Sequence, residues 1–142
     1  MNYFDSCYLA KLYLMEPDSP RVRAAAAASD GLACCATGWG EVVATLHRHF
    51  REKRLTQREF RQLAAQVEAD VDAGLWTSLP VTSSLVESQA RRMVALPASV
   101  FLRAADALHL TCAAEAGLTE IHSSDRHLAA AAPHFGLKAV TL

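Results

Sequence analysis

Short apolar segments alternate along the chain with longer segments in which apolar residues recur every three or four positions. The short segments have the length and composition of buried strands, whereas the longer ones have the spacing of one helix face, as in Val86, Ala90 and Met93. Strands that alternate with helices are joined by crossover connections, which favours a parallel sheet. The five predicted strands are residues 3–4, 32–36, 75–79, 120–122 and 138–142.

Proline, glycine and small polar residues mark the predicted helix boundaries. Pro20 stands where the first turn of a helix tolerates proline. Thr56 and Glu59 have the spacing of a capping box, in which each side chain bonds the other's backbone N–H. Gly117 and Gly136 stand where helical periodicity stops, as glycine does in left-handed helix ends. These signals place helices between all the predicted strands.

The fold class predicted from this pattern is α/β, with three α/β/α layers around a five-stranded, mainly parallel sheet. No repeat or linker interrupts the pattern, so we expect residues 1–142 to form one domain. Residues 41–74 are expected to form a helical hairpin with Leu55 in its turn. In parallel sheets, reactive residues gather at the carboxyl ends of strands. Asp5 and Asp125 therefore attract attention, because each follows a predicted strand and precedes a predicted helix.

Composition and charge narrow the classes of function. Apolar residues make up 51% of the 142 residues, which is enough for a core and argues against disorder. Acidic residues number 15 and basic residues 14, so no overall cationic surface is available to hold nucleic acid. Any such partner must be held by local patches or by bound cations.

The apolar segments also bear on location. None approaches the ~20 residues that a membrane span requires, and the first residues lack the features of a signal peptide. We therefore expect a cytoplasmic protein with no membrane partner. No C-x-x-C spacing occurs, and in a reducing compartment cysteines act as small buried apolar residues. This is the expectation for all four: Cys7, Cys34, Cys35 and Cys112.

A stripe of basic residues offers one local patch. Its members recur at three- and four-residue spacing, with Lys53 beside them, and two interpretations remain open. The stripe could follow an RNA backbone, or it could be the solvated face of a helix that is interrupted near Leu55. The arginines are Arg48, Arg51, Arg54, Arg58 and Arg61.

Four acidic residues stand at positions that structure alone does not favour. Each still has a structural explanation. Asp5 and Asp125 could cap helices, and Glu41 could complement the dipole of the helix that it is expected to open. Asp106 interrupts an apolar helix in which aspartate is a poor helix former, and Arg103, three residues earlier, could be its ion-pair partner.

Taken together, the four acids predict a metal site. Carboxylates within about 5 Å of each other repel by about 3 kcal/mol per pair at an effective dielectric constant near 20. Protons or cations must offset that repulsion, and hard divalent ions such as Mg²⁺ or Mn²⁺ prefer oxygen ligands. Such a site suits phosphoryl chemistry, because the ion activates a water molecule and stabilises charge on the phosphate.

At these residues the sequence resembles the PIN-domain ribonucleases, specifically the VapC-type toxins of bacterial toxin–antitoxin pairs. The resemblance runs from end to end and rests on four motifs in order: apolar-apolar-Asp-Ser/Thr, a Glu after the second strand, Arg-x-x-Asp-x-x-His, and Thr/Ser-x-Asp before a helix. The matching residues are Tyr3-Phe4-Asp5-Ser6, then Glu41, then Arg103, Asp106 and His109, then Ser123-Ser124-Asp125.

The resemblance implies a PIN-like three-layer domain and an endoribonuclease that depends on Mg²⁺ or Mn²⁺. It also implies a homodimer, an RNA substrate and a cognate antitoxin that blocks the pocket. The expected catalytic and metal-binding residues are Asp5, Glu41, Asp106 and Asp125. The residues expected to support them without holding the ion are Ser6, Ser123, Arg103 and His109.

The sequence departs from the family pattern at two places. Cys7 stands where a second small hydroxyl residue is common, which alters hydrogen bonding beside the metal. Gly38 and Gly40 each cost a helix about 1 kcal/mol relative to alanine. We therefore expect the helix to begin at Glu41, after these glycines.

Two other functions with strand-end aspartates fit less well. A phosphatase of the haloacid-dehalogenase type needs a second acid two residues after the first, where this chain has Cys7. A receiver-type signalling domain needs an aspartate after the third strand and a lysine after the fifth, but Pro80 follows the third strand and Lys138 precedes the last. A non-catalytic PIN-like module that binds RNA or protein, with a degenerate acidic pocket, remains the alternative.

Overall fold

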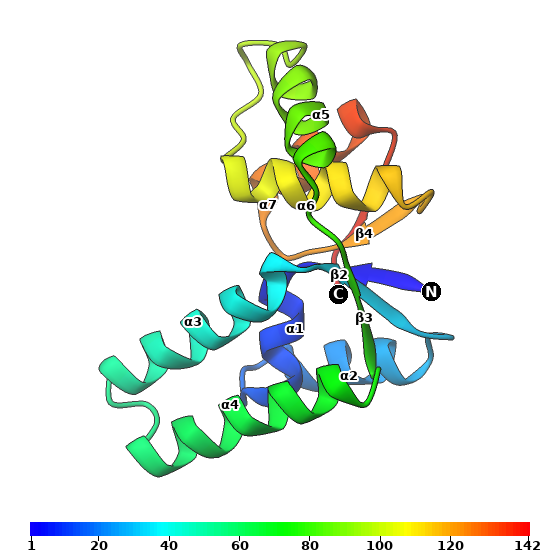
Figure 1. The fold of residues 1–142 in the computed structure, drawn as a ribbon. Helices are drawn as coiled ribbons and strands as arrows, with labels where there is room; N and C mark the ends of the chain where they lie inside the picture. Colours follow the sequence, from blue (N-terminus) through cyan, green and yellow to red (C-terminus); the bar gives the residue numbers. More distant parts are fainter.

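The five predicted strands all form, and they pair in a single sheet of order β3-β2-β1-β4-β5. The computed structural model describes residues 1–142 (Figure 1). Every neighbouring pair is parallel, so the sheet is wholly rather than mainly parallel. The strands are β1 (Asn2–Phe4), β2 (Leu32–Cys35), β3 (Trp76–Leu79), β4 (Glu120–His122) and β5 (Lys138–Val140).

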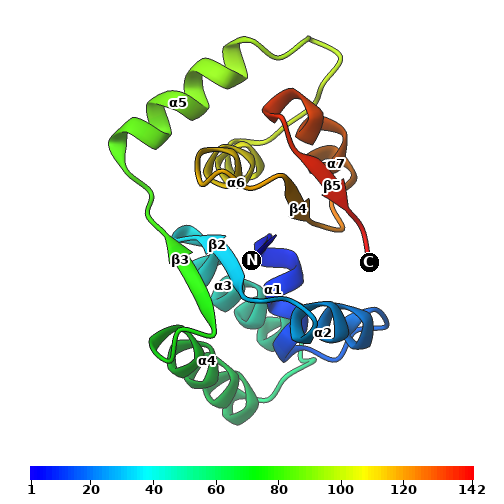
Figure 2. The same ribbon diagram turned by 90° about the vertical axis from the view of Figure 1, so that its right-hand side faces the viewer.

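Helices cover both faces of the sheet, which gives the three predicted layers. In Figures 1 and 2, α1 to α4 lie on one side and α5 to α7 on the other. None of the helices has the length and apolar character needed to cross a membrane. Their bounds are α1 (Ser6–Tyr13), α2 (Ser19–Ala27), α3 (Thr37–Arg51), α4 (Gln57–Asp72), α5 (Ser83–Val94), α6 (Ala104–Glu115) and α7 (Arg126–Ala131), followed by a short 3₁₀ helix, η1 (Ala132–Phe135).

The central strand β1 forms the middle of the core. Tyr3 lies between Ala33 of β2 and Ile121 of β4, and all three are wholly buried. Strands covered on both faces have continuous apolar runs rather than alternating ones, which is why β1 and β2 could be recognised in the sequence. Because β1 and β4 are neighbours, the residues that follow them emerge at the same edge of the sheet.

The helix boundary signals were correct. Thr56 and Glu59 form the complete capping box at the start of α4. Pro20 lies in the first turn of α2. Gly117, after α6, and Gly136, after η1, have φ angles of 73° and 76°, in the left-handed region that glycine adopts without strain.

The helical hairpin consists of α3 and α4, and its start was predicted wrongly. α3 begins at Thr37 rather than Glu41, so Glu41 lies in the second helical turn. The reason is a close approach to β2: a Cβ on Gly38 would lie only 2.3 Å from Cys34 Sγ. Glycine at this position lets the helix start against the strand. Leu55 does lie in the turn between the two helices, as expected.

Other boundaries also differ from the expectation, by one residue in β1, β2 and β3 and by more in the three cases that follow. α6 begins at Ala104, directly after Arg103, so Asp106 lies in its first turn instead of mid-helix. Asp125 follows the end of β4 by three residues and caps α7. The last strand ends at Val140, two residues early.

Three of the four cysteines are buried, as the sequence predicted. They are Cys34, Cys35 and Cys112, and all four cysteines carry free thiols. Cys7 is the exception, because it is exposed in the first turn of α1. It lies there beside Asp5, at the edge of the sheet where the acidic residues meet.

Candidate active site

All four candidate acids line one pocket of about 420 Å³ at the carboxyl ends of β1 and β4. They arrive from four elements: Asp5 from the end of β1, Glu41 from α3, Asp106 from α6 and Asp125 from the start of α7. Ser6, Arg103 and His109 line the same pocket. Ser123 reaches it by a hydrogen bond to Asp5. The structure thus brings together all eight residues singled out from the sequence.

Asp5 is the most deeply buried of the four acids, with 4% of its surface exposed. Its Oδ1 accepts a hydrogen bond of 2.9 Å from the Tyr8 backbone N–H, which caps α1. Its Oδ2 accepts a hydrogen bond of 2.5 Å from the Ser123 hydroxyl. Burial raises the pKa of Asp5, and these two hydrogen bonds oppose the rise. No Lys or Arg side chain forms an ion pair with Asp5.

Glu41 is held by two donors on one oxygen. Its Oε2 accepts from the Ser6 hydroxyl at 2.5 Å and from Nε2 of His109 at 3.1 Å. Burial alone would raise the pKa of Glu41, but the His109 and Ser6 contacts outweigh it and lower the pKa. The carboxylate is therefore ionised at neutral pH. Because two donors hold Oε2 in place, the position of Oε1 is fixed as well.

His109 is oriented by groups beneath the pocket. Its Nδ1 lies 2.9 Å from the Tyr3 hydroxyl, which also accepts the backbone N–H of Cys35 at 2.9 Å. Cys35 Sγ and Cys34 Sγ lie 3.4 and 3.8 Å from the same nitrogen. Burial would lower the pKa of His109, but its contacts with Cys35 and Glu41 outweigh this and raise it to about 10. The ring is locked with a protonated Nε2 facing Glu41.

Arg103 joins the remaining two acids. Its Nε donates to Oδ2 of Asp106 and its Nη2 donates to Oδ2 of Asp125, each at 2.9 Å. Oδ1 of Asp125 accepts the backbone N–H groups of His127 and Leu128 at the start of α7. Burial opposes ionisation of Asp125, but these hydrogen bonds and the Arg103 charge lower its pKa. One guanidinium, with a single positive charge, therefore bridges two of the four acids.

The donor set fits a hard divalent ion. The four carboxylates offer oxygen ligands, which Mg²⁺ and Mn²⁺ prefer over sulfur or nitrogen. The hydrogen bonds on Glu41 and Asp106 fall on a single oxygen of each, Oε2 and Oδ2. The second oxygen of each remains available to an ion. Neither a lysine nor a zinc-type histidine set lines the pocket.

Two residues near the site were not singled out from the sequence for it. Tyr3 read only as part of an apolar strand, and nothing in the pattern indicated that its hydroxyl reaches His109. Arg48 belongs to the basic stripe, and it alone of that stripe lines the acidic pocket. A signal for Arg48 did exist, since it follows Glu41 by seven positions and so shares its face of α3. The other stripe arginines are exposed on α3, α4 and their turn.

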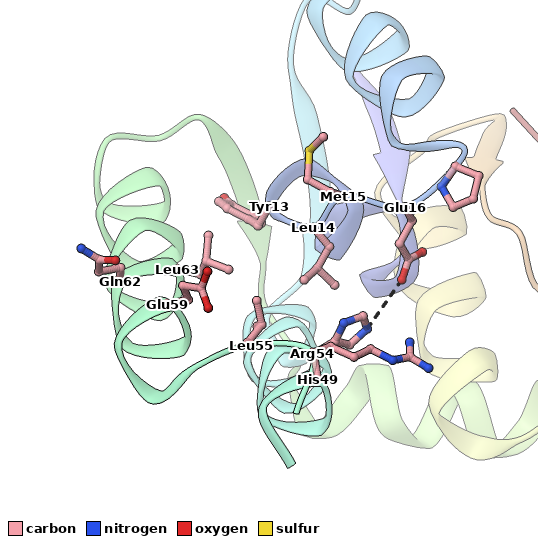
Figure 3. Close-up of a pocket in the computed structure, with 11 residues that line it drawn as sticks. Tyr13, Leu14, Met15, Glu16, His49, Arg54, Leu55, Glu59, Gln62 and Leu63 are labelled. Carbon is pink, nitrogen blue, oxygen red and sulfur yellow. Dashed lines mark ion pairs between the residues drawn. The ribbon is translucent and has the colours of Figure 1, made fainter. Parts of the chain in front are cut away.

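The largest cleft of the molecule lies elsewhere. It has a volume of about 670 Å³ and lies between the end of α1 and the α3–α4 hairpin, and none of the four acids lines it. Figure 3 shows Leu14, Leu55 and Leu63 around this cleft and the contact between His49 and Glu16, whose atoms are 3.6 Å apart. The cleft is an apolar surface with charged residues at its margin, distinct from the acidic pocket.

Comparison with known proteins agrees with the fold. The solved structure of Mycobacterium tuberculosis VapC20, a toxin that cleaves the sarcin–ricin loop, superposes with a TM-score of 0.72 at 16% sequence identity. The match covers 92% of this chain and 95% of VapC20. A comparison with curated proteins finds no match. The PIN-domain family model matches residues 3–133, and the chain therefore belongs to the PIN-domain family.

Proposed function

We propose that this chain is a metal-dependent endoribonuclease that acts as the toxin of a toxin–antitoxin pair, with Mg²⁺ or Mn²⁺ as its ion. The observation that carries the proposal is the convergence of four carboxylates from four elements on one pocket. Membership of the PIN-domain family and the likeness in fold to a toxin that cleaves the sarcin–ricin loop support it. Residues 1–142 act as one nuclease domain in this proposal.

Asp5, Glu41, Asp106 and Asp125 hold one or two ions. When bound, a divalent ion supplies a water molecule of lowered pKa and positive charge beside the scissile phosphate. The role of the protein is to hold the four carboxylates in fixed positions. Hydrogen bonds from residues that do not bind the ion orient the carboxylates before the ion arrives, which lowers the free-energy cost of ion binding.

The hydrogen-bond donors differ between the acids. Ser123 fixes Asp5, and the N-terminus of α7 fixes Asp125. Ser6 and His109 fix Glu41. Because His109 is charged and buried against Glu41, it keeps that carboxylate ionised without occupying the pocket itself. RNA cleavage leaves 5′-phosphate and 3′-hydroxyl ends.

The partners follow from the same proposal. The chain acts in the cytoplasm on RNA, and a cognate antitoxin restrains it. The apolar cleft of Figure 3 is the docking site for that antitoxin. Support comes from position: His49 of α3 lines the cleft and the adjacent residue of the helix, Arg48, lines the acidic pocket, so one helix carries part of both. The chain also forms a homodimer, which sedimentation of the purified protein tests.

A second candidate is a non-catalytic PIN-like module that binds RNA or protein. It is favoured by one observation, the two ion pairs of Arg103, because these balance Asp106 and Asp125 without a metal ion. A degenerate pocket, however, has no need of all four acids.

One experiment separates the two candidates. A mixed RNA pool is incubated with the purified chain, with Mg²⁺ or with EDTA, beside the variants Asp5→Asn and Asp30→Asn. Asp30 is an exposed acid outside the pocket and serves as the matched control. The nuclease proposal expects cleavage by the wild type and Asp30→Asn that EDTA abolishes, and none by Asp5→Asn. Cleavage that survives EDTA, or none by the wild type, contradicts it.

A further inference from the structure

Arg103 stands where the proposed metal site would otherwise have two uncompensated charges. It is the residue just before α6, and its planar guanidinium spans from Asp106 on that helix to Asp125 at the start of α7. Both contacts are 2.9 Å, the length of charge-assisted hydrogen bonds. Without this bridge, two like charges would face each other across the pocket. In the ion-free protein, Arg103 therefore reduces the repulsion between Asp106 and Asp125, as a bound metal ion would.

The same oxygen of Asp125 is needed by both cations. Oδ1 of Asp125 is committed to two backbone N–H groups of α7. That leaves Oδ2 as the oxygen that can face an ion, and Oδ2 is the atom that Arg103 holds. A guanidinium and a divalent ion on one oxygen would repel each other at close range. The two therefore compete for Asp125.

Exposure makes the displacement feasible. The Arg103 side chain is 63% exposed, so water can solvate its charge once it leaves, and ion pairs that exposed are weak. A divalent ion carries twice the charge and can also reach the oxygens of Glu41 and Asp106 that accept no hydrogen bond. Arg48, in contrast, lines the same pocket but forms no ion pair with any of the acids.

We propose that Arg103 is an internal counter-ion that competes with the divalent ion for Asp125 and is displaced from Asp125 when the ion binds. The inference rests on the proposed function, since it takes the acidic pocket to be a metal site. It assigns to Arg103 the setting of ion affinity: the guanidinium holds the empty site together and raises the ion concentration needed to fill it.

Ion affinity provides the first test. Mn²⁺ binding is measured by electron paramagnetic resonance of free Mn²⁺ for the wild type, Arg103→Met and Arg48→Met. Loss of any positive charge near the pocket tightens binding somewhat, and the Arg48 variant measures that general effect. We expect Arg103→Met to bind Mn²⁺ at least tenfold more tightly than the wild type and Arg48→Met to change less than threefold. Equal effects of the two substitutions overturn the inference.

The side chain itself provides the second test. The Nη–H signals of Arg103 are followed by ¹⁵N nuclear magnetic resonance and assigned by their loss in Arg103→Lys. In EDTA Nη2 donates to Asp125. On addition of Mg²⁺ we expect its signal to move to the position of a solvent-exposed arginine. A signal unchanged at saturating Mg²⁺ overturns displacement. This readout uses the wild-type protein, so it holds even where Arg103→Met folds poorly.

The outcomes also separate this inference from the proposed function. Binding of Mn²⁺ by the wild type that Asp5→Asn abolishes, together with no gain in Arg103→Met, contradicts only the role of Arg103. No Mn²⁺ binding to the wild-type pocket contradicts both proposals. Tighter binding in Arg103→Met and a displaced Nη–H signal support both the metal site and its internal competitor.

Discussion

Nε2 of His109 lies 3.1 Å from Oε2 of Glu41, and this contact ties α6 to α3 across the edge of the sheet. The two side chains are 68 positions apart in sequence. His109 is buried and Glu41 is half-buried at the pocket wall, so a charged pair here is coupled far more strongly than one in open water. Because this contact forms only when α3 and α6 are in place, the pKa of His109 differs between the folded and the unfolded chain.

Stability should therefore depend on pH through His109. Its pKa in the folded chain is about 10, above the ordinary value of 6.5, so the folded state holds its proton more tightly than the unfolded state. The resulting stabilisation is fully present below pH 6.5 and is lost as pH rises through 10. The Cys35 thiol opposes this loss up to pH 9, because its pKa is lowered to about 3 in the folded chain. Urea unfolding in EDTA should therefore show the free energy of unfolding falling by about 1–2 kcal/mol between pH 9 and 10. In His109→Gln the decline should be much smaller, and equal declines in both proteins contradict the assignment.

Removal of one acid should separate activity from stability. Asp5→Asn and Asp106→Asn should each lower RNA cleavage at least 100-fold, because an amide is a poor ligand for a hard ion. Asparagine still caps α1 at position 5, and this substitution removes a charge that has no cationic partner. In EDTA, the free energy of unfolding of Asp5→Asn should equal or exceed that of the wild type. Asp106→Asn also loses its exposed ion pair with Arg103, so its free energy of unfolding should change little. Marked destabilisation would mean that the carboxylates serve the fold rather than an ion.

Ser123 should matter to both fold and site, because its hydroxyl donates to Asp5 and accepts the backbone N–H of Asp125 at 2.9 Å. Ser123→Ala leaves these two groups without their buried partner, which costs about 1–3 kcal/mol of stability. The Mn²⁺ affinity should fall about 10- to 100-fold, as it does when a metal ligand loses its support. The exposed neighbour Ser124 supplies the control, and Ser124→Ala should change neither quantity by a comparable amount.

The two glycines of α3 should respond in opposite directions. A Cβ at Gly38 would meet Cys34 Sγ at 2.3 Å, so Gly38→Ala should lower the free energy of unfolding by about 1–3 kcal/mol through overpacking. Gly40 has nothing within 4 Å of the same atom, so Gly40→Ala should raise it by about 0.5–1 kcal/mol through helix propensity. Urea titration of the two variants measures both. A stabilised Gly38→Ala would show that α3 does not approach β2 this closely.

Local signals carried much of the fold. The apolar runs of β1 and β2 and the capping box of α4 depend on neighbouring residues alone, so they could be recognised directly. The meeting of Asp5 and Asp125 could also be predicted, because parallel neighbouring strands end at one edge. The strand and helix signals and the shared edge of parallel strands do not depend on contacts between residues far apart in sequence.

The predictions failed where a contact between residues far apart in sequence determines a helix boundary or the role of a side chain. Gly38 looked like a poor helix residue, yet its missing side chain is what allows α3 to start against Cys34. Asp106 looked buried within a helix, yet α6 begins two residues before it, and Arg103 reaches from there to Asp125. The hydroxyl of Tyr3 is invisible in a pattern of apolar positions, although it orients His109.

Strand β1 has only three residues, and both its middle residue and the residue just after it serve the same edge of the sheet. Tyr3 reaches His109 from the strand, and Asp5 closes it two positions later. Side chains alternate between the faces of a sheet, so a slip of one residue in β1 would turn both groups away together. Correct pairing of β1 with its two neighbours therefore also assembles the proposed active site. A partly folded chain in which β1 is not yet paired would lack nuclease activity and would not harm the cell that makes it.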